Sequence, residues 1–234
     1  MGRLLCFAVA SLLTAGTFLF CDWEREYLPT PTQIVENIMD CGVTINGVEE
    51  ESITIGSGVL YRANGELYVL TAAHVLGNKP TGLLITQRCI DDDSVCLIWS
   101  GEVVAKDIES DWAIVRPVGE AKSILGGTTF MLSSPRVGHG VYTLGNPLGE
   151  DNTLSEGIVA NHNRAVEWNT DKHIVVTCSG APGSSGGGVY DIHTGKCFGI
   201  VVRRNPTVNL LYVVPIETIR KDLEQMGKSE LLPP

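Results

Sequence analysis

The chain has 234 residues, of which 44% are hydrophobic and 19% are charged, and this composition excludes an intrinsically disordered protein. Its net charge of −10 at pH 7, with no stripe of basic residues, excludes the electrostatic pattern of a nucleic-acid-binding protein. The 26 glycine residues favour an all-β protein with many tight turns.

Residues 1–20 have the layout of an export segment, because Arg3 precedes an uncharged run from Leu4 to Phe20. A signal peptidase could remove this segment, or residues 4–20 could stay as a membrane anchor. Cys21 offers a third outcome, a lipid anchor, although Phe20 stands where a lipoprotein signal has a small residue. All three outcomes predict that the rest of the chain is extracytoplasmic, either periplasmic or secreted.

The next segment, residues 21–40, is predicted to be a polar tether followed by a short helix over 32–39. Prolines interrupt the tether, and Thr30 or Thr32 provides a side chain that can cap the helix. From residue 43 onward the pattern changes to short β-rich runs.

These runs indicate a sandwich or a barrel, because they recur at short intervals with Gly or Asp turns between them. Asn64-Gly65 is a strong signal for a tight hairpin between two of the runs. A second series of strands begins after Gly126-Gly127. Apolar residues between 215 and 226 then recur with helical spacing and predict a terminal helix.

Seven cysteines are present, but no two of them form a C-x-x-C pair, which argues against a zinc ribbon or a thioredoxin-type site. Cys89 and Cys96 flank a predicted turn at 91–93 and are candidates for a disulfide. The sequence leaves open whether they pair or remain free thiols, because it does not give their Cα separation. The histidines other than His74 lack metal-binding spacing and are expected at the surface or in loops, so neither a metal nor a cofactor is predicted.

Three segments carry residues typical of nucleophilic catalysis. His74 follows small residues at the end of an apolar strand, Asp111 stands at the entrance of another strand, and Ser185 lies in the glycine-rich turn 181–188. A serine hydroxyl needs a base to accept its proton, and histidine has a pKa suited to that role near neutral pH. The imidazolium that forms needs a carboxylate to orient it. In peptide hydrolysis the tetrahedral intermediate carries an oxyanion, which fixed backbone N–H donors stabilise. Glycines in the turn let the backbone bend and approach the substrate closely.

The sequence from about Gly56 to Glu224 resembles the trypsin/chymotrypsin-fold serine proteases, and most closely their bacterial HtrA/Deg branch. Three motifs carry the resemblance: Thr71-Ala72-Ala73-His74, Asp111-Trp112-Ala113-Ile114-Val115 and Gly183-Ser184-Ser185-Gly186-Gly187. The runs at 144–149, 155–159 and 212–216 also resemble that branch. The resemblance implies a serine endopeptidase acting on proteins or peptides through an acyl-enzyme. His74 is then the base, Asp111 its orienter and Ser185 the nucleophile, while the N–H groups of Gly183 and Ser185 form the oxyanion hole.

The resemblance also implies the fold, which is two six-stranded antiparallel β-barrels with a short C-terminal helix. The expected organisation is an export segment at 1–20, a tether and helix at 21–40, a trypsin-like domain at 41–226 and a tail at 227–234. Within that domain, barrel one spans about 41–120, barrel two about 127–215 and the helix 215–226. The expected organisation includes no PDZ domain.

Two departures from the family pattern concern the nucleophile turn. Ser184 replaces an Asp that pairs with a freed N-terminus in the digestive enzymes, so activation by pro-segment cleavage is not implied. Gly188 replaces a proline, which predicts a looser turn.

The resemblance implies that Ser179, six positions before Ser185, lies at the base of the specificity pocket, with Gly180 and Ala181 beside it. A neutral, small base predicts cleavage after small to medium aliphatic residues, because a substrate Lys or Arg would bury an unpaired charge. The strand containing Val202, Arg203 and Arg204 should pair with the substrate. The two arginines either accept acidic substrate groups or are solvated charges at a strand edge.

Two other readings compete with an active protease. A catalytically inactive relative that binds peptides would keep the fold without the chemistry. An α/β-hydrolase is excluded by the order His, Asp, Ser along the chain and by the lack of alternating helices. The sequence does not indicate an oligomeric state.

Overall fold

The structure is a computed structural model that describes residues 29–48, 52–77, 82–88, 95–119, 126–150, 152–166 and 169–232. Its first element is helix α1 (Pro31–Met39), which begins one residue before the predicted start. Thr30 is the N-cap: its hydroxyl accepts a hydrogen bond from the Gln33 N–H, and the Gln33 side chain accepts one from the Thr30 N–H. This reciprocal capping box satisfies two N–H groups that the helix itself leaves unpaired.

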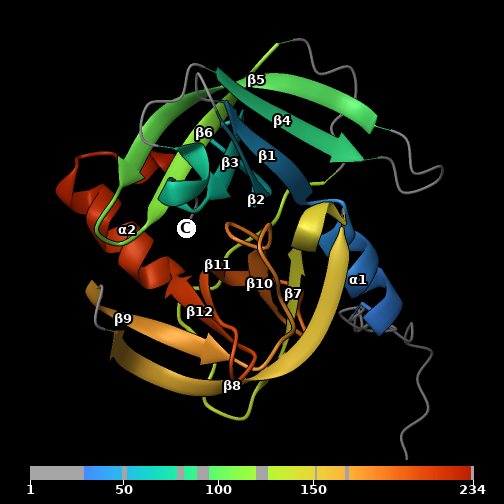
Figure 1. The fold of residues 1–234 in the computed structure, drawn as a ribbon, viewed down its shortest axis with the longest axis vertical. Helices are drawn as coiled ribbons and strands as arrows, with labels where there is room; N and C mark the ends of the chain where they lie inside the picture. Colours follow the sequence, from blue (N-terminus) through green and yellow to red (C-terminus); the bar gives the residue numbers. More distant parts are fainter. Residues whose placement is uncertain are drawn as a thin grey trace, which may run out of the picture.

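Six antiparallel strands close barrel one in the order β1-β2-β3-β6-β5-β4 (Figure 1). The predicted hairpin at Asn64-Gly65 joins β2 to β3, and both residues have the positive φ, 51° and 83°, that such a turn requires. The strands are β1 (Gly42–Val48), β2 (Ile53–Ala63), β3 (Glu66–Thr71), β4 (Gly82–Arg88), β5 (Val95–Asp107) and β6 (Trp112–Val118).

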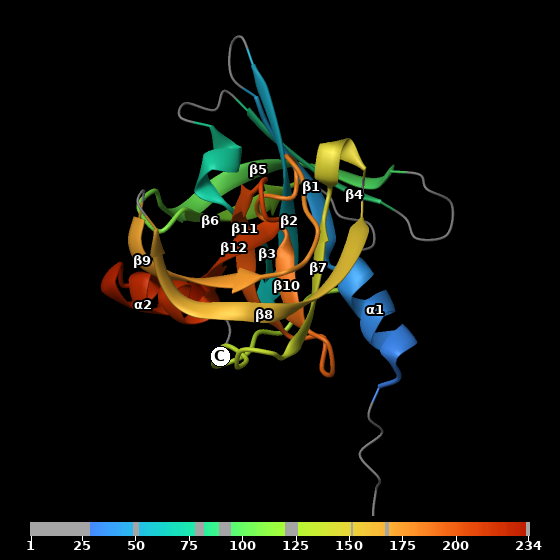
Figure 2. The same cartoon turned by 60° about the horizontal axis from the view of Figure 1, so that its bottom comes forward.

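Barrel two has the same number of strands, in the order β10-β11-β12-β9-β8-β7, and lies next to barrel one (Figures 1 and 2). All pairings in both barrels are antiparallel, which confirms the predicted fold class. The strands are β7 (Gly140–Gly145), β8 (Thr153–Val166), β9 (Asn169–Val176), β10 (Gly188–Asp191), β11 (Cys197–Asn205) and β12 (Leu210–Pro215).

The predicted terminal helix is present as α2 (Ile216–Gln225), followed by the short helix η3 (Ser229–Leu231). This segment follows barrel two in sequence but is bonded to barrel one. The Trp112 indole N–H donates to the Asp222 carboxylate at 2.8 Å, and the Tyr61 hydroxyl donates to the Leu231 carbonyl at 2.7 Å. The segment therefore links the two barrels and holds their relative position, on which any site between them depends.

The described cysteines Cys41, Cys178 and Cys197 are buried free thiols. Burial raises the pKa of Cys41 and Cys197 to about 12 and that of Cys178 to about 11, so these thiols are protonated at neutral pH. The proposed pairing of Cys89 with Cys96 lies outside the described residues and side chains.

No helix in the described part of the chain is long and apolar enough to cross a membrane. The candidate export segment, residues 1–20, lies outside that part.

Candidate active site

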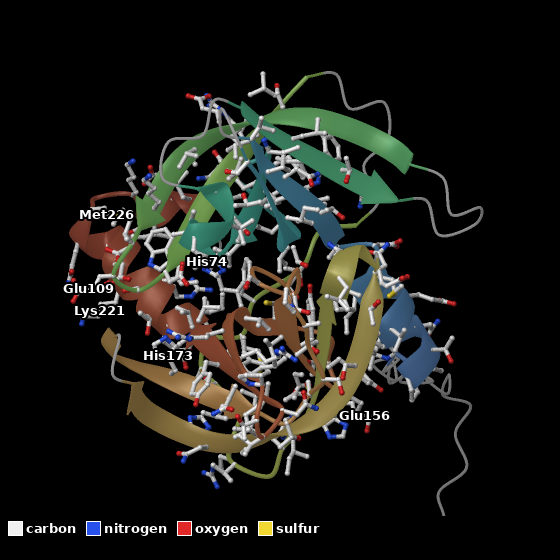
Figure 3. The ribbon with its side chains drawn as sticks, viewed as in Figure 1. His74, Glu109, Glu156, His173, Lys221 and Met226 are labelled. Carbon is white, nitrogen blue, oxygen red and sulfur yellow. The ribbon has the colours of Figure 1, made fainter. Side chains whose placement is uncertain are left out.

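A pocket of about 510 Å³ opens between the two barrels. Barrel one contributes His74 and Asp111, and barrel two contributes Ser185. The residues that sequence reasoning selected from three distant segments therefore line one pocket. Figure 3 shows the His74 side chain at the junction of the barrels.

The Asp111 carboxylate holds His74 by two hydrogen bonds. His74 lies in the short helix η1 (Ala73–Leu76) after β3, and its Nδ1 is 2.7 Å from Asp111 Oδ2. Asp111 Oδ1 accepts a second bond, from the His74 backbone N–H at 3.0 Å. A carboxylate is only an acceptor, so the Nδ1 position carries the proton in this contact and the neutral ring keeps Nε2 as its acceptor.

Asp111 reaches this position because of its backbone conformation. It ends the turn between β5 and β6 with φ of 58°, a left-handed value that few residues other than Gly, Asn and Asp tolerate. Its backbone carbonyl accepts the Ala73 N–H at 3.3 Å. The turn is thereby joined to η1 by backbone as well as by side chain.

The turn at Ser185 leaves two N–H groups without a protein acceptor in the described part of the chain. The Pro182 carbonyl accepts the Leu148 N–H at 2.7 Å, from the short helix η2 (Pro147–Gly149). In a trans peptide the carbonyl and the N–H point in opposite directions, so the Gly183 N–H faces away from η2. Within the described part of the chain, neither this N–H nor that of Ser185 donates to any protein acceptor.

Ser57 of β2 holds the nucleophile turn from the opposite barrel, and sequence reasoning did not single it out. Its hydroxyl donates to the Gly183 carbonyl at 2.7 Å and accepts the Asn146 N–H at 2.8 Å. Its backbone N–H donates to the Ser185 carbonyl at 2.7 Å. The only local sequence signal for this role is a serine between two glycines in an apolar strand.

The expected substrate-binding residues do not all lie together. Ala181, Val202, Arg203 and Arg204 line the pocket of Ser185. Ser179 does not: it is solvent-exposed and borders a separate cavity of only about 10 Å³.

Gly180 does not line this pocket either, but its carbonyl accepts a hydrogen bond from the Arg204 guanidinium at 3.3 Å. Behind it, Leu211 packs so closely that a Cβ on Gly180 would lie 2.8 Å from a Leu211 methyl carbon. Pro206, which sequence reasoning did not select, completes the wall.

The family model described as "Trypsin-like peptidase domain" matches residues 56–200, which include all three candidate catalytic residues. The chain belongs to the trypsin-like peptidase family. A relative in Staphylococcus aureus strain USA300, "Serine protease HtrA-like", is 32% identical over 192 residues. That match covers 74% of this chain but only 24% of the relative, so the chain spans about a quarter of that protein's length.

Solved structures show the same fold for this trypsin-like chain. The HtrA-type protease AlgW, solved with a tripeptide, has a TM-score of 0.70 at 22% identity, and the match covers 86% of this chain and 64% of the AlgW chain. The inactive form of Rv3671c from M. tuberculosis has a TM-score of 0.65 at 17% identity, and the match covers 83% of this chain and 90% of the Rv3671c chain.

The trypsin-like domain accommodates Gly188 in a paired strand rather than in a loose turn. Gly188 begins β10, is buried, and pairs with Leu144 on one side and Ile200 on the other. A Cβ there would lie 2.4 Å from the Tyr190 hydroxyl oxygen. Tyr190 therefore fills the space that a proline ring would need.

Not every other histidine of this trypsin-like domain is in a surface or loop position, which corrects the expectation. His173 is buried in β9, and its label in Figure 3 lies beside that strand. His139 hydrogen-bonds the buried Asp191 carboxylate. Burial alone would raise the pKa of Asp191, but hydrogen bonds from Thr194, His139 and the backbone outweigh it and lower that pKa.

Among the described residues, no group of His, Cys, Asp or Glu could hold a metal ion.

Proposed function

We propose that this chain is a serine endopeptidase that hydrolyses peptide bonds in proteins or peptides. The observation that carries the proposal is the Asp111–His74 hydrogen bond of 2.7 Å at the wall of the pocket that also holds Ser185. Two N–H groups with no protein acceptor adjoin that serine in the same turn. Family membership supports the same chemistry.

In the proposed mechanism, Ser185 Oγ attacks the scissile carbonyl carbon while His74 Nε2 takes the hydroxyl proton. Asp111 stabilises the resulting imidazolium and keeps its orientation. The Gly183 and Ser185 N–H groups donate to the negatively charged carbonyl oxygen of the tetrahedral intermediate. The intermediate collapses to an acyl-enzyme when His74 returns the proton to the leaving amine. Water then attacks the acyl carbon while His74 takes its proton, and His74 returns that proton to Ser185 Oγ as the ester bond breaks and the acid leaves.

β11 offers the substrate a place to pair as an added strand. Its ladder with β10 ends at Ile200, while its ladder with β12 continues to Asn205. Between these limits Val202 and Arg204 line the pocket, next to the nucleophile. An extended peptide can add to such a strand edge through main-chain hydrogen bonds, which places its carbonyl groups in sequence along the pocket.

The competing function is a catalytically inactive, protease-like module that binds peptides. A fluorophosphonate probe distinguishes the two, because it bonds covalently only to a serine whose hydroxyl is activated. We expect mass spectrometry to locate the probe on Ser185 in the wild type and on no residue in Ser185→Ala. An unlabelled wild type that still binds peptides would favour the inactive module.

We also propose that residues 1–20 export the domain at 41–226, with residues 4–20 or a lipid on Cys21 as possible anchors. Arg3 followed by an uncharged run motivates this assignment. Deletion of residues 2–20 should retain the protein in the cytoplasm, as measured by cell fractionation with the full-length chain as control. Full-length chain recovered in the cytoplasmic fraction would contradict export.

A further inference from the structure

Arg204 places a positive charge in the proposed active site without a matching negative charge. Its side chain is half-buried and lines the same pocket as Ser185. The described hydrogen bond of its guanidinium is to a neutral acceptor, the Gly180 carbonyl, at 3.3 Å. No described carboxylate forms an ion pair with it.

The carboxylate that shares the pocket is already committed to another residue. Asp111 accepts from both the side chain and the backbone of His74, at 2.7 and 3.0 Å. Arg204 presents five N–H donors in a fixed fork, of which the Gly180 carbonyl uses one. Donors therefore remain to bind a ligand that enters the pocket.

The wall beside Arg204 is unsuited to a long apolar side chain. Leu211 packs directly against Gly180, and the cavity beside Ser179 holds only about 10 Å³. An aliphatic group pushed toward this wall would cover the Arg204 guanidinium and remove its water without replacing the lost hydrogen bonds.

We propose that Arg204 selects an acidic residue, Asp or Glu, at the position that supplies the scissile carbonyl. This inference rests on the proposed function and specifies its substrate class. A substrate carboxylate can form a charge-assisted, bidentate pair with the guanidinium, whereas a substrate Lys or Arg is repelled. The chain's net charge of −10 opposes the binding of an acidic substrate residue only weakly, because salt screens charges beyond about 8 Å at physiological ionic strength.

The test compares peptides that differ only in Glu or Gln before the scissile bond, since these side chains have the same shape. We expect wild-type kcat/KM to be at least about tenfold higher for Glu. Arg204→Gln should bring this ratio close to one, and Arg204→Lys, which keeps the charge but loses the fork, should retain part of it. The control is Arg136→Gln, an exposed site outside the pocket with the same charge change, which should keep the wild-type ratio.

A wild-type ratio near one, or an unchanged ratio in Arg204→Gln, would overturn the selection of acidic residues by Arg204. If Ser185 is nevertheless labelled by fluorophosphonate and an Ala or Val peptide is cleaved, the proposed endopeptidase stands and only the substrate class fails. A wild type that is neither labelled nor cleaves any peptide overturns both. Because the readout is a ratio within one variant, partial misfolding of Arg204→Gln does not imitate the expected result.

Discussion

Replacement of Ser185 by alanine is expected to lower kcat for peptide hydrolysis by more than about a thousandfold. The change removes the only atom that forms the acyl bond in the proposed mechanism, so the His74–Asp111 pair has no hydroxyl to activate. The two N–H groups of the turn remain and account for a small residual rate. Steady-state kinetics on a chromogenic peptide, with active-site titration of the wild type, measures the effect.

The matched control is Ser133→Ala, which removes an exposed hydroxyl outside the pocket and should leave kcat unchanged. Equal thermal unfolding of the two variants would show that the loss is chemical and not structural. Near-native kcat in Ser185→Ala would refute the assignment of the nucleophile and, with it, the proposed triad.

Gly186→Ala is expected to destabilise the fold by about 4 kcal/mol or more and to abolish activity. Gly186 has a φ of 85°, which an L side chain rarely adopts. A Cβ there would lie 2.1 Å from the Ser57 carbonyl oxygen and 2.3 Å from Thr71 Oγ1. These two groups are themselves hydrogen-bonded at 2.7 Å, so neither can move without breaking the contact that holds β2 and β3 beside the nucleophile turn.

Gly138→Ala separates the cost of the positive φ from the cost of the steric conflict. Gly138 has nearly the same φ, 87°, but no atom lies within 4 Å of its added Cβ. The backbone cost alone, about 1–2 kcal/mol, is expected there. Urea unfolding of both variants gives the comparison, and the difference measures the steric conflict with Ser57 and Thr71. Equal costs for the two glycines would show that the nucleophile turn is not packed against barrel one as the structure has it.

Local features of the fold were predictable because neighbouring residues decide them. Asn64-Gly65 adopts two positive φ values wherever it closes a tight hairpin, and Thr30 caps a helix through Gln33, three residues away. The helix at 216–225 follows in the same way from the spacing of its apolar residues.

The pocket was less predictable because its walls come from segments that contact only after both barrels close. Ser57 bonds a carbonyl 126 positions away, and Arg204 bonds one 24 positions away. Leu211 reaches Gly180 because β12 pairs with β9, which ends just before that glycine. Pairing register between distant strands decides such contacts, and no short segment encodes it.

The sequence by itself determined the candidates His74, Asp111 and Ser185, because short motifs carry them. The strand pattern indicated only a sandwich or a barrel, and the double-barrel class followed from the family resemblance of those motifs. Only the tertiary structure decided that the Ser57 hydroxyl supports the nucleophile turn and that Ser179 lies outside the pocket while Arg204 lies within it. The physical reason is that burial and hydrogen-bond partners depend on which distant strands become neighbours, and those neighbours exist only in the closed barrels.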